Sequence, residues 1–497
     1  MSDVVVVGAG VGGLATALRL AAAGHRVTVL ERSGNVGGKL GRYSRKTRAG
    51  TFHFDTGPSL LTLPHILTDL FEATGGGLAD HLDLVELNPI VRHRFADGTV
   101  LDSCADPDAF ADRIAAALGG TQAAEWRRLW RRAERVWNAS WKHVLTAPAR
   151  STVALSTLAW RVGDLAAIGP GQTLRGVARR YLSDPRLRML LERYATYSGA
   201  DPRRAPAALL AIPYAEMRYG GWYLRGGLGT LGDALLARCE ELGVRVHLDT
   251  PVREIEAAGG RVHGVRLAGG ARIPADVVVA NTDALEVYRD LLPHKRQARR
   301  LRERSLAGFV MLLGVHGRTP RLAHHTVLFP SDYDAEFDDV FGHPRRGIVA
   351  QPAREPAIFV TVPDDPLVRP DGHEAWFVLV NAPPQGDDAA SVDWTRRELI
   401  EGYANRILDL LARRGVEVRN RVLFRKLRTP ADLQVATASP GGAIYGTPAH
   451  GLTGLRRPGN RGPARGLFLV GGSVHPGGGL PMVMLSAKIV STQIGPA

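Results

Sequence analysis

Short apolar runs alternate with helix-like segments at the start of the chain. Residues 4–7 are four consecutive valines, and such an uninterrupted β-branched run predicts a strand buried on both faces. Residues 14–23 are rich in Ala and Leu and predict a helix that ends at Gly24. Residues 26–30 alternate like a second strand. The order strand, helix, strand predicts an α/β fold with a parallel sheet.

Glycines and one acidic residue stand where a bound dinucleotide needs them. Gly8, Gly10 and Gly13 match the spacing G-x-G-x-x-G, and Gly12 lies in the same loop. The first glycine allows a tight turn, the second lets the backbone approach a pyrophosphate, and the third allows close helix–strand packing. Glu31, at the end of the second strand, can accept hydrogen bonds from a ribose. We therefore predict a dinucleotide-binding unit.

A second glycine pair favours FAD over NAD. Gly37-Gly38-Lys39 follows the acid closely, a pattern typical of FAD proteins of the amine-oxidase and desaturase type. Residues 54–58, Phe-Asp-Thr-Gly-Pro, resemble the F-D-x-G-P segment of the phytoene desaturase family of carotenoid-biosynthesis flavoenzymes. The resemblance implies FAD as the cofactor. The cofactor-binding candidates of this region are Arg32, Gly37, Gly38, Lys39, Gly57 and Pro58.

The far end of the chain completes the predicted site. Residues 466–470 predict a strand, and residues 482–492 predict a helix. The loop between them, residues 471–481, closely resembles the same family's G-x-x-x-H-P-G-x-G-x-P signature. The positive end of the helix would stabilise negative charge at the pyrimidine end of a flavin. The candidates here are Gly471, Gly472, Pro481, Met482 and Val483.

The middle of the chain supports a discontinuous FAD domain. Residues 228–241 predict a helix, and residues 244–248 and 275–281 predict strands. The matching region of the family lies beside the adenine, so the resemblance adds Val252 to the cofactor-binding candidates. We expect a Rossmann-type FAD-binding domain of amine-oxidase and GDI-like build, together with an α+β substrate domain. The FAD domain is expected over about residues 1–85, 225–285 and 460–497, and the substrate domain over about 86–224 and 286–459.

Tryptophans gather in the predicted substrate domain. Residues 121–145 predict a helix on which four tryptophans fall within about 60° of one another, opposite a basic face. Two interpretations stay open: a core-packed helix with a solvated basic face, or the wall of an apolar tunnel or membrane interface. The basic residues 294–304 predict a solvated helix face, with attraction to a membrane surface as the alternative. The tryptophans are Trp126, Trp130, Trp137 and Trp141.

The resemblance also implies the reaction. Residues 193–199, 215–223 and 442–451 resemble the branch of 1-hydroxycarotenoid 3,4-desaturases. Family membership implies desaturation of a long apolar polyene, in which a hydride leaves an allylic carbon for flavin N5 and a proton leaves the neighbouring carbon. The electrons must then reach oxygen, a quinone or another acceptor. The candidates for the reacting end are Tyr197, Glu216, Tyr219 and His475, of which the last can act as a base or fix the shape of its loop.

Composition narrows the function classes. A hydrophobic fraction of 45% suits a globular protein and excludes a wholly disordered chain. Cys104 and Cys239 are the only cysteines among 497 residues, which excludes a disulfide framework and a Cys-rich metal site and suits a reducing cytoplasm. His324-His325 lacks the other ligands of a zinc site, so we expect a loop pair and no metal.

The charge bears on partners and location. The net charge is +14 and the isoelectric point is about 10.2, which suits solvent or an anionic membrane more than nucleic acid. No apolar run approaches the roughly 18 residues of a membrane span. Residues 1–3 lead directly into the first strand, so we expect no signal peptide. We expect a cytoplasmic protein, with peripheral docking on the inner face of the cell membrane.

Three alternatives stay open. A related flavoenzyme could use NADPH to close rings in a polyene tetramate macrolactam. A flavin amine oxidase shares the glycine and Glu31 pattern but not the terminus around His475. Rab GDP-dissociation inhibitors have a similar fold, bind lipidated proteins and hold no flavin, whereas this chain keeps the complete glycine set.

Overall fold

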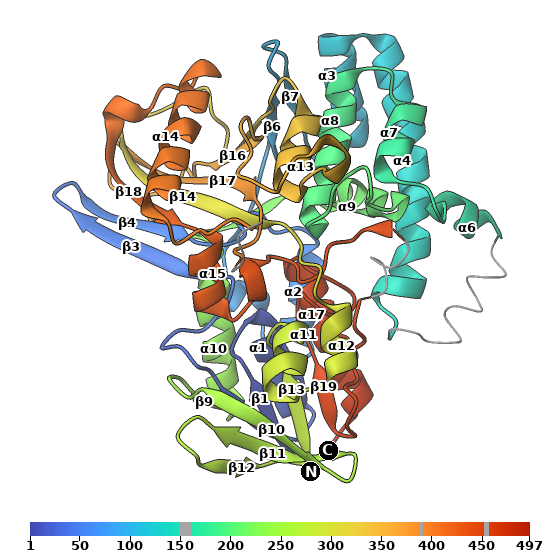
Figure 1. Cartoon of the computed structure of the whole chain (residues 1–497), viewed down its shortest axis with the longest axis vertical. Coiled ribbons are helices and arrows are strands. Elements are labelled where there is room, and N and C mark those ends of the chain that lie inside the picture. The colour runs from blue at the N-terminus through green and yellow to red at the C-terminus, as the bar shows by residue number, and fades with distance from the viewer. Residues whose placement is uncertain (149–161, 387–390, 452–456) are drawn as a thin grey trace.

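A five-stranded parallel sheet forms the lower part of the molecule as seen in Figure 1. The computed structural model describes residues 1–148, 162–386, 391–451 and 457–497. The sheet has the order β19-β13-β1-β2-β9, and it joins strands from distant parts of the chain, which confirms the α/β fold class. The strands are β1 (Asp3–Val7), β2 (Arg26–Leu30), β9 (Arg245–His247), β13 (Val277–Ala280) and β19 (Leu467–Leu469).

Both faces of the parallel sheet are covered, which explains the unbroken valine run of β1. Val4 and Val6 pack in the cluster that includes helix α1, whereas Val5 and Val7 pack in a second cluster with Ile255 on the opposite face. Three helices lie side by side on the first face: α1 (Val11–Ala22), α10 (Thr230–Glu241) and α17 (Leu480–Ile494). Each overlaps a predicted helix and differs from it by at most three residues at either end.

The second face is covered by an antiparallel sheet and short helices. The sheet contains β10 (Val252–Ala258), β11 (Arg261–Leu267) and β12 (Arg272–Pro274). Gly259 and Gly260 join β10 to β11 with φ values of 58° and 74°, as a two-residue hairpin turn requires. The nearby helices are α11 (Ala284–Glu286) and α12 (Lys295–Arg300). The basic helix is therefore shorter than predicted.

A seven-stranded sheet forms the centre of the upper part, with the order β18-β14-β17-β16-β15-β6-β7. Strand β14 (Ala307–His316) alternates: Phe309 and Met311 pack with helix α14 (Arg397–Arg413), whereas Val310 and Leu312 face the hairpin of β3 (Arg42–Thr47) and β4 (Gly50–Asp55). The other strands are β6 (Arg92–Arg94), β7 (Val100–Asp102), β15 (His325–Leu328), β16 (Ile358–Thr361), β17 (His373–Ala382) and β18 (Val422–Arg428).

The tryptophan helix lies in a helical layer beside this sheet. Helix α4 (Gly120–Ser140) continues into one π-helical turn at residues 141–145. Trp126 and Trp137 are buried, which supports core packing for these two residues and removes them from any membrane-facing surface. The neighbouring helices are α3 (Pro107–Leu118), α6 (Val162–Ile168), α7 (Leu174–Tyr181), α8 (Pro185–Arg193) and α9 (Ala211–Tyr219).

Five further helices and strands complete the elements that position the site. They are α2 (Pro64–Glu72), β5 (Leu84–Glu86), β8 (Trp222–Leu224), α13 (Tyr333–Phe341) and α15 (Pro430–Thr437). The hairpin of β3 and β4 packs on the upper sheet, while Leu291 and Leu301 pack with the parallel sheet. These contacts cross the predicted boundaries at residues 85 and 285, and the division into domains stays a prediction.

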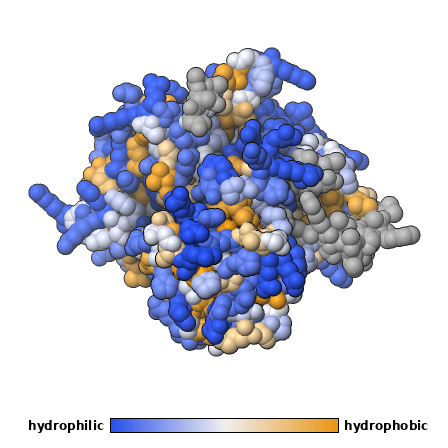
Figure 2. Space-filling view, turned by 60° about the horizontal axis from the view of Figure 1, so that its bottom comes forward, coloured by the Kyte–Doolittle hydropathy of each residue, from blue (hydrophilic) through white to orange (hydrophobic). Residues whose placement is uncertain are grey.

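Hydrophilic side chains dominate the face of the molecule shown in Figure 2, where apolar residues form small patches. Within the part of the chain that the structure describes, no helix is both long enough and apolar enough to span a membrane.

Candidate functional site

A cavity of about 1100 Å³ opens where the carboxyl ends of the parallel strands meet the upper sheet. Fourteen of the predicted cofactor residues line it: Gly8, Gly10, Gly12, Glu31, Arg32, Gly37, Gly38, Lys39, Gly57, Pro58, Val252, Gly471, Gly472 and Val483. Gly13, Pro481 and Met482 do not line it. The carboxyl end of a parallel sheet is the usual place for a ligand crevice, and here segments from both termini meet there.

The glycine loop is packed so closely that side chains do not fit. A Cβ added to Gly13 would lie 2.1 Å from the carbonyl oxygen of Gly8, and one added to Gly10 would lie 2.6 Å from Nδ2 of Asn281. The absence of a side chain at Gly13 therefore lets α1 pack closely against the end of β1, although Gly13 itself does not line the cavity. Asn281 itself lines the cavity, and sequence reasoning gave it no role. Its signal was its place directly after strand β13, at the same edge of the sheet.

Glu31 fixes the backbone around the end of β2. Its Oε2 accepts a hydrogen bond from the backbone N–H of Ala9 at 2.8 Å. Its Oε1 accepts bonds from the N–H of Ser33 at 2.9 Å and from its hydroxyl at 2.8 Å. The carboxylate thus ties the glycine loop to the next loop. Its contact with a ribose stays a prediction.

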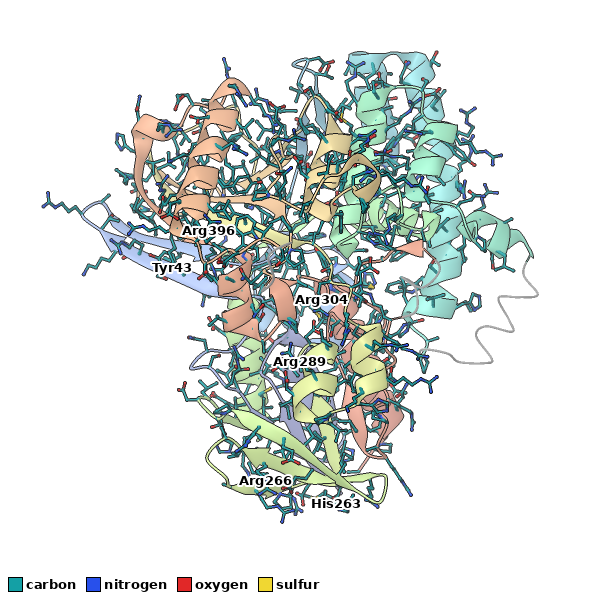
Figure 3. The ribbon with its side chains drawn as sticks, viewed as in Figure 1. Tyr43, His263, Arg266, Arg289, Arg304 and Arg396 are labelled. Atoms are coloured by element: carbon teal, nitrogen blue, oxygen red, sulfur yellow. The ribbon has the colours of Figure 1, made fainter. Side chains whose placement is uncertain are left out.

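Positive charge gathers around Lys39, which lines the cavity, whereas Arg304 and Arg457 lie near it outside the lining. Nζ of Lys39 donates hydrogen bonds to the carbonyl oxygens of residues 443 and 444 at 3.0 and 2.7 Å. Because the amine is buried, its pKa is lowered to about 8. Arg304, which lies between the upper and lower parts in Figure 3, donates to Asp283 at 2.6 Å. Burial lowers the pKa of Arg457 to about 10. Three cations face one carboxylate here, which favours an anionic ligand.

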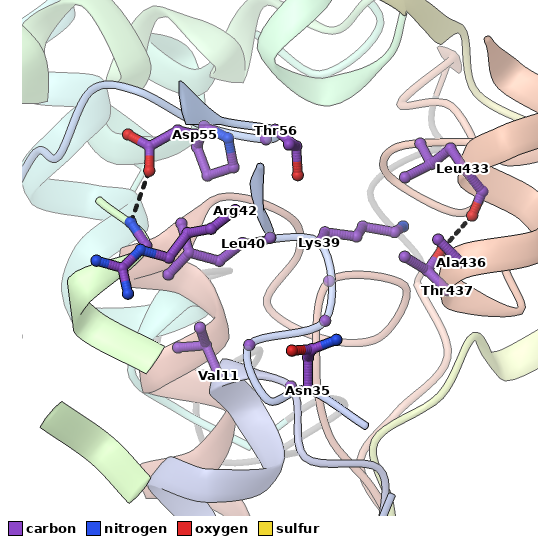
Figure 4. Close-up of a pocket in the computed structure, with 18 of the residues that line it drawn as sticks. Val11, Asn35, Lys39, Leu40, Arg42, Asp55, Thr56, Leu433, Ala436 and Thr437 are labelled. Carbon is purple, nitrogen blue, oxygen red and sulfur yellow. Dashed lines mark hydrogen bonds between the residues drawn. The ribbon is translucent and has the colours of Figure 1, made fainter. Parts of the chain in front are cut away.

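Asp55 lines the cavity and holds the backbone that leads into helix α10 (Figure 4). Its two carboxylate oxygens accept hydrogen bonds from the N–H groups of Leu228 and Gly229, both at 2.8 Å. Burial raises the pKa of Asp55 to about 6. The sequence placed Asp55 inside a motif but assigned it no role, because its partners lie more than 170 residues away.

The shape and chemistry of this part of the cavity fit FAD. An added Cβ at Gly10 or Gly12 would collide with Asn281 at the crevice, so only the bare loop leaves room for a pyrophosphate. The adjacent cations complement phosphate charge. The cavity volume slightly exceeds the roughly 300–1,000 Å³ that small-molecule pockets occupy, as a large cofactor with an adjoining substrate requires.

The opposite wall of the same cavity is apolar. Val310 of β14 pairs with Leu379 of β17, and both side chains line the cavity together with Phe377 and Ala375. Phe54 of the β4 hairpin lines it from below the sheet. The cofactor crevice and an apolar sheet face therefore form one continuous space, which lets an apolar substrate meet a bound cofactor.

The four predicted catalytic residues lie outside the lining of this cavity. The structure brings two of them together: the hydroxyl of Tyr197 donates to Glu216 at 3.1 Å. Tyr219 lies on the aromatic side of α4, with its ring 5.7 Å from that of Trp137. His475 is buried, and its Nε2 lies 2.9 Å from the carbonyl oxygen of Ala147. Their roles in the reaction stay predictions.

The histidine pair differs from expectation in one respect. His325 is the first residue of strand β15 and is fully buried, so the pair does not form a loop. Its ring lies 4.6 Å from that of His324, which lies 4.6 Å from the ring of Tyr223. Across the described ranges, no group of three or more His, Cys, Asp or Glu side chains could hold a metal ion.

Known proteins match the chain over nearly its whole length. The family model described as flavin containing amine oxidoreductase matches residues 11–495. A 4,4'-diapolycopene oxygenase from a Methylomonas species is 34% identical and covers 99% of this chain and 97% of its own. A hydroxyneurosporene desaturase from Cereibacter sphaeroides is also 34% identical, with 98% and 96% covered. An oxidoreductase structure from Methanosarcina mazei shares the fold, with a TM-score of 0.66, 17% identity, and 99% and 100% covered.

Proposed function

Because the chain belongs to the flavin containing amine oxidoreductase family, and within it to the carotenoid desaturases, we propose that it desaturates a carotenoid or a similar long polyene. FAD, when bound, supplies a two-electron acceptor for a hydride from an allylic carbon. The single observation that carries the substrate class is the shared cavity, in which the apolar face of β14 and β17 adjoins the glycine crevice.

We propose that the lining glycines and Glu31 hold the dinucleotide, and that Lys39 faces its negative charge. The apolar wall keeps water from the reacting carbons, where positive charge develops and conjugation spreads it. Little acid or base strength is needed there. We assign His475 to positioning, since its Nε2 bonds to a backbone carbonyl and holds the cofactor loop near residues 144–147.

The first measurement is an anaerobic absorbance spectrum of the FAD-loaded protein with carotenoids in liposomes. Bleaching of the oxidised flavin bands, together with a carotenoid spectrum shifted to longer wavelength, is the expected result. Bleaching only with NADPH would favour polyene cyclisation, and peroxide formation from amines would favour an amine oxidase. A protein that never binds flavin, even after reconstitution, would refute the enzyme proposal and favour a lipid-binding one.

Oxygenation is the second candidate, because one 34% identical relative carries the name of a diapolycopene oxygenase. Mass spectrometry of the product separates the two activities. A desaturase removes two hydrogens per turnover, whereas an oxygenase adds oxygen. We propose oxygen or a quinone as the final electron acceptor in the desaturase reaction.

We also propose peripheral docking on the inner face of the cell membrane. The net charge of +14 and the basic helix α12 support attraction to anionic lipid. The protein should float with anionic liposomes at low salt and be released at high salt. Failure to float at low salt contradicts the docking proposal but leaves the desaturase proposal intact.

A further inference from the structure

Tyr223, in the middle of strand β8, brings a hydroxyl to the wall of the cavity. It lines the cavity and keeps 4% of its surface exposed. Its hydroxyl donates a hydrogen bond to Oδ2 of Asp365 at 2.9 Å. Desaturation releases a proton as well as a hydride, and a group that takes the proton must come within hydrogen-bond reach of the substrate. The four predicted catalytic residues lie outside the lining, whereas Tyr223 belongs to it.

Asp365 is a buried carboxylate that is bound by uncharged groups. It follows strand β16 and is 2% exposed. Its oxygens accept hydrogen bonds from the hydroxyl of Tyr223, the N–H of Gly226 at 2.6 Å and the N–H of Leu367 at 2.9 Å. Within the described ranges, the ion pairs of this loop are made by the neighbouring Asp364, with two arginines. Because no cation is bonded to Asp365 and holds it in the ionised form, its carboxylate is suited to accept a proton.

The pair of Tyr223 and Asp365 lies where the predicted cofactor segment meets the apolar wall. Ser59 directly follows Pro58, and its hydroxyl shares a hydrogen bond with that of Thr361 at 3.0 Å. Ser59 and Thr361 both line the cavity, and Thr361 stands opposite Phe377 of the apolar wall where β16 pairs with β17. The carboxylate partner of Tyr223 follows Thr361 by four residues. The phenol is therefore close to both parts of the cavity.

Other polar groups of the cavity are already engaged. Asp283 pairs with Arg304, both oxygens of Asp55 accept backbone N–H groups, and Lys39 is protonated at neutral pH because its pKa is about 8. Tyr223 differs, because a hydroxyl can accept a hydrogen bond on its oxygen while it donates its own proton. Burial, together with the neighbouring carboxylate, raises the pKa of Tyr223. The phenol therefore stays protonated, and it can take up a proton only by passing on its own.

We propose that Tyr223 and Asp365 form a proton relay for the desaturation. This inference rests on the proposed function and assigns the base that the function leaves open. The allylic C–H bond breaks, and its hydrogen leaves with the electron pair as a hydride to the oxidant, a bound flavin dinucleotide. The neighbouring C–H bond then breaks, and its electron pair forms the new C=C bond.

The proton of that second bond moves to the oxygen of Tyr223, while the hydroxyl proton of Tyr223 moves to Oδ2 of Asp365. The polyene loses one hydride and one proton, Tyr223 ends as it began, and Asp365 later releases the proton to water. A weak base is sufficient, because the positive charge left on the polyene makes the neighbouring C–H strongly acidic. The relay therefore explains how a protonated phenol can serve as the base.

The test follows hydride loss and proton loss separately. An acyclic carotenoid with one CH₂–CH₂ unit beside its conjugated chain is labelled with deuterium at the allylic carbon or at its neighbour. It is presented in phosphatidylcholine liposomes to the FAD-loaded protein without oxygen. Flavin bleaching reports hydride loss, and the shift of the carotenoid spectrum to longer wavelength reports formation of the new double bond.

Tyr223→Phe should form the product about a hundredfold more slowly, the usual effect of losing an acid–base group. Its isotope effect for deuterium at the neighbouring carbon should increase, because proton loss becomes the slow step. FAD titration should give the wild-type affinity, since the relay does not hold the cofactor. Asp365→Asn should slow the reaction in the same way. The double variant should be no slower than the slower single variant, because both side chains act on one proton.

Tyr43→Phe is the matched control, because it removes the same hydroxyl from a tyrosine that does not line the cavity. It should keep the wild-type rates and isotope effects. An unchanged isotope effect or an unchanged rate in Tyr223→Phe would overturn the relay, and so would losses that multiply in the double variant. Tyr223→Phe decides alone if Asp365→Asn does not fold. A wild type that no polyene bleaches would instead contradict the proposed function, and the relay with it.

Discussion

Gly13 offers a direct test of how tightly helix α1 is held against strand β1. In Gly13→Ala, the new Cβ would lie 2.1 Å from the backbone oxygen of Gly8, about 1.3 Å short of the 3.4 Å at which ordinary contact begins. Backbone cannot rotate away as a flexible side chain can, so helix and strand must separate. Overpacking of this kind costs about 1–3 kcal/mol, against a helix gain of about 0.5–1 kcal/mol for Gly→Ala.

Gly402→Ala is the matched control, since Gly402 is an exposed glycine within α14 with no atom near its Cβ position. Urea unfolding followed by circular dichroism should show Gly402→Ala at or slightly above wild-type stability and Gly13→Ala below it. FAD titration should show at least a tenfold weaker affinity for Gly13→Ala, because its loop carries the predicted pyrophosphate site. If both variants unfold alike and bind FAD like the wild type, the close approach inferred at Gly13 is wrong.

Three other changes test the polar groups around the cavity. In the wild type, FAD affinity should fall by at most about tenfold per pH unit above about pH 8, because Lys39 loses its proton there. Fluorescence titration at several pH values should show that this pH dependence of the affinity is absent in Lys39→Met and unchanged in the control Lys46→Met. Asp55→Asn should cost about 1–3 kcal/mol at neutral pH, since an amide NH₂ would face one of two backbone donors. Burial raises the pKa of Asp55 from 3.8 to about 6. Between these two pH values the carboxyl is protonated in the folded chain and ionised in the unfolded chain. Urea unfolding should therefore show that the stability of the wild type falls relative to that of Asp55→Asn as the pH rises through this range. Asn460→Ala should speed flavin release measured by fluorescence, because the amide donates to the carbonyls of Leu469 and His475 that shape the C-terminal loop.

Local sequence signals predicted much of the fold. The valine run of β1, the glycine loop and the Ala/Leu-rich α1 depend on contacts between near neighbours in sequence, and each lies within a few residues of its predicted place. The end of α4 was less accurate, because the helix changes to a π-helical turn at Trp141. The helical periodicity of a sequence does not reveal such a change in the backbone hydrogen-bonding pattern.

The sequence by itself determined the α/β class and the glycine-rich part of the crevice lining, because a strand, a glycine turn and a helix start need only local geometry. The tertiary structure decided the environment of each group. Lys39 and its acceptor Ala443 are 404 positions apart, and the apolar wall forms only when β14 and β17 pair. Burial, which shifts pKa values and leaves donors unpaired, is set by long-range packing that no local pattern encodes.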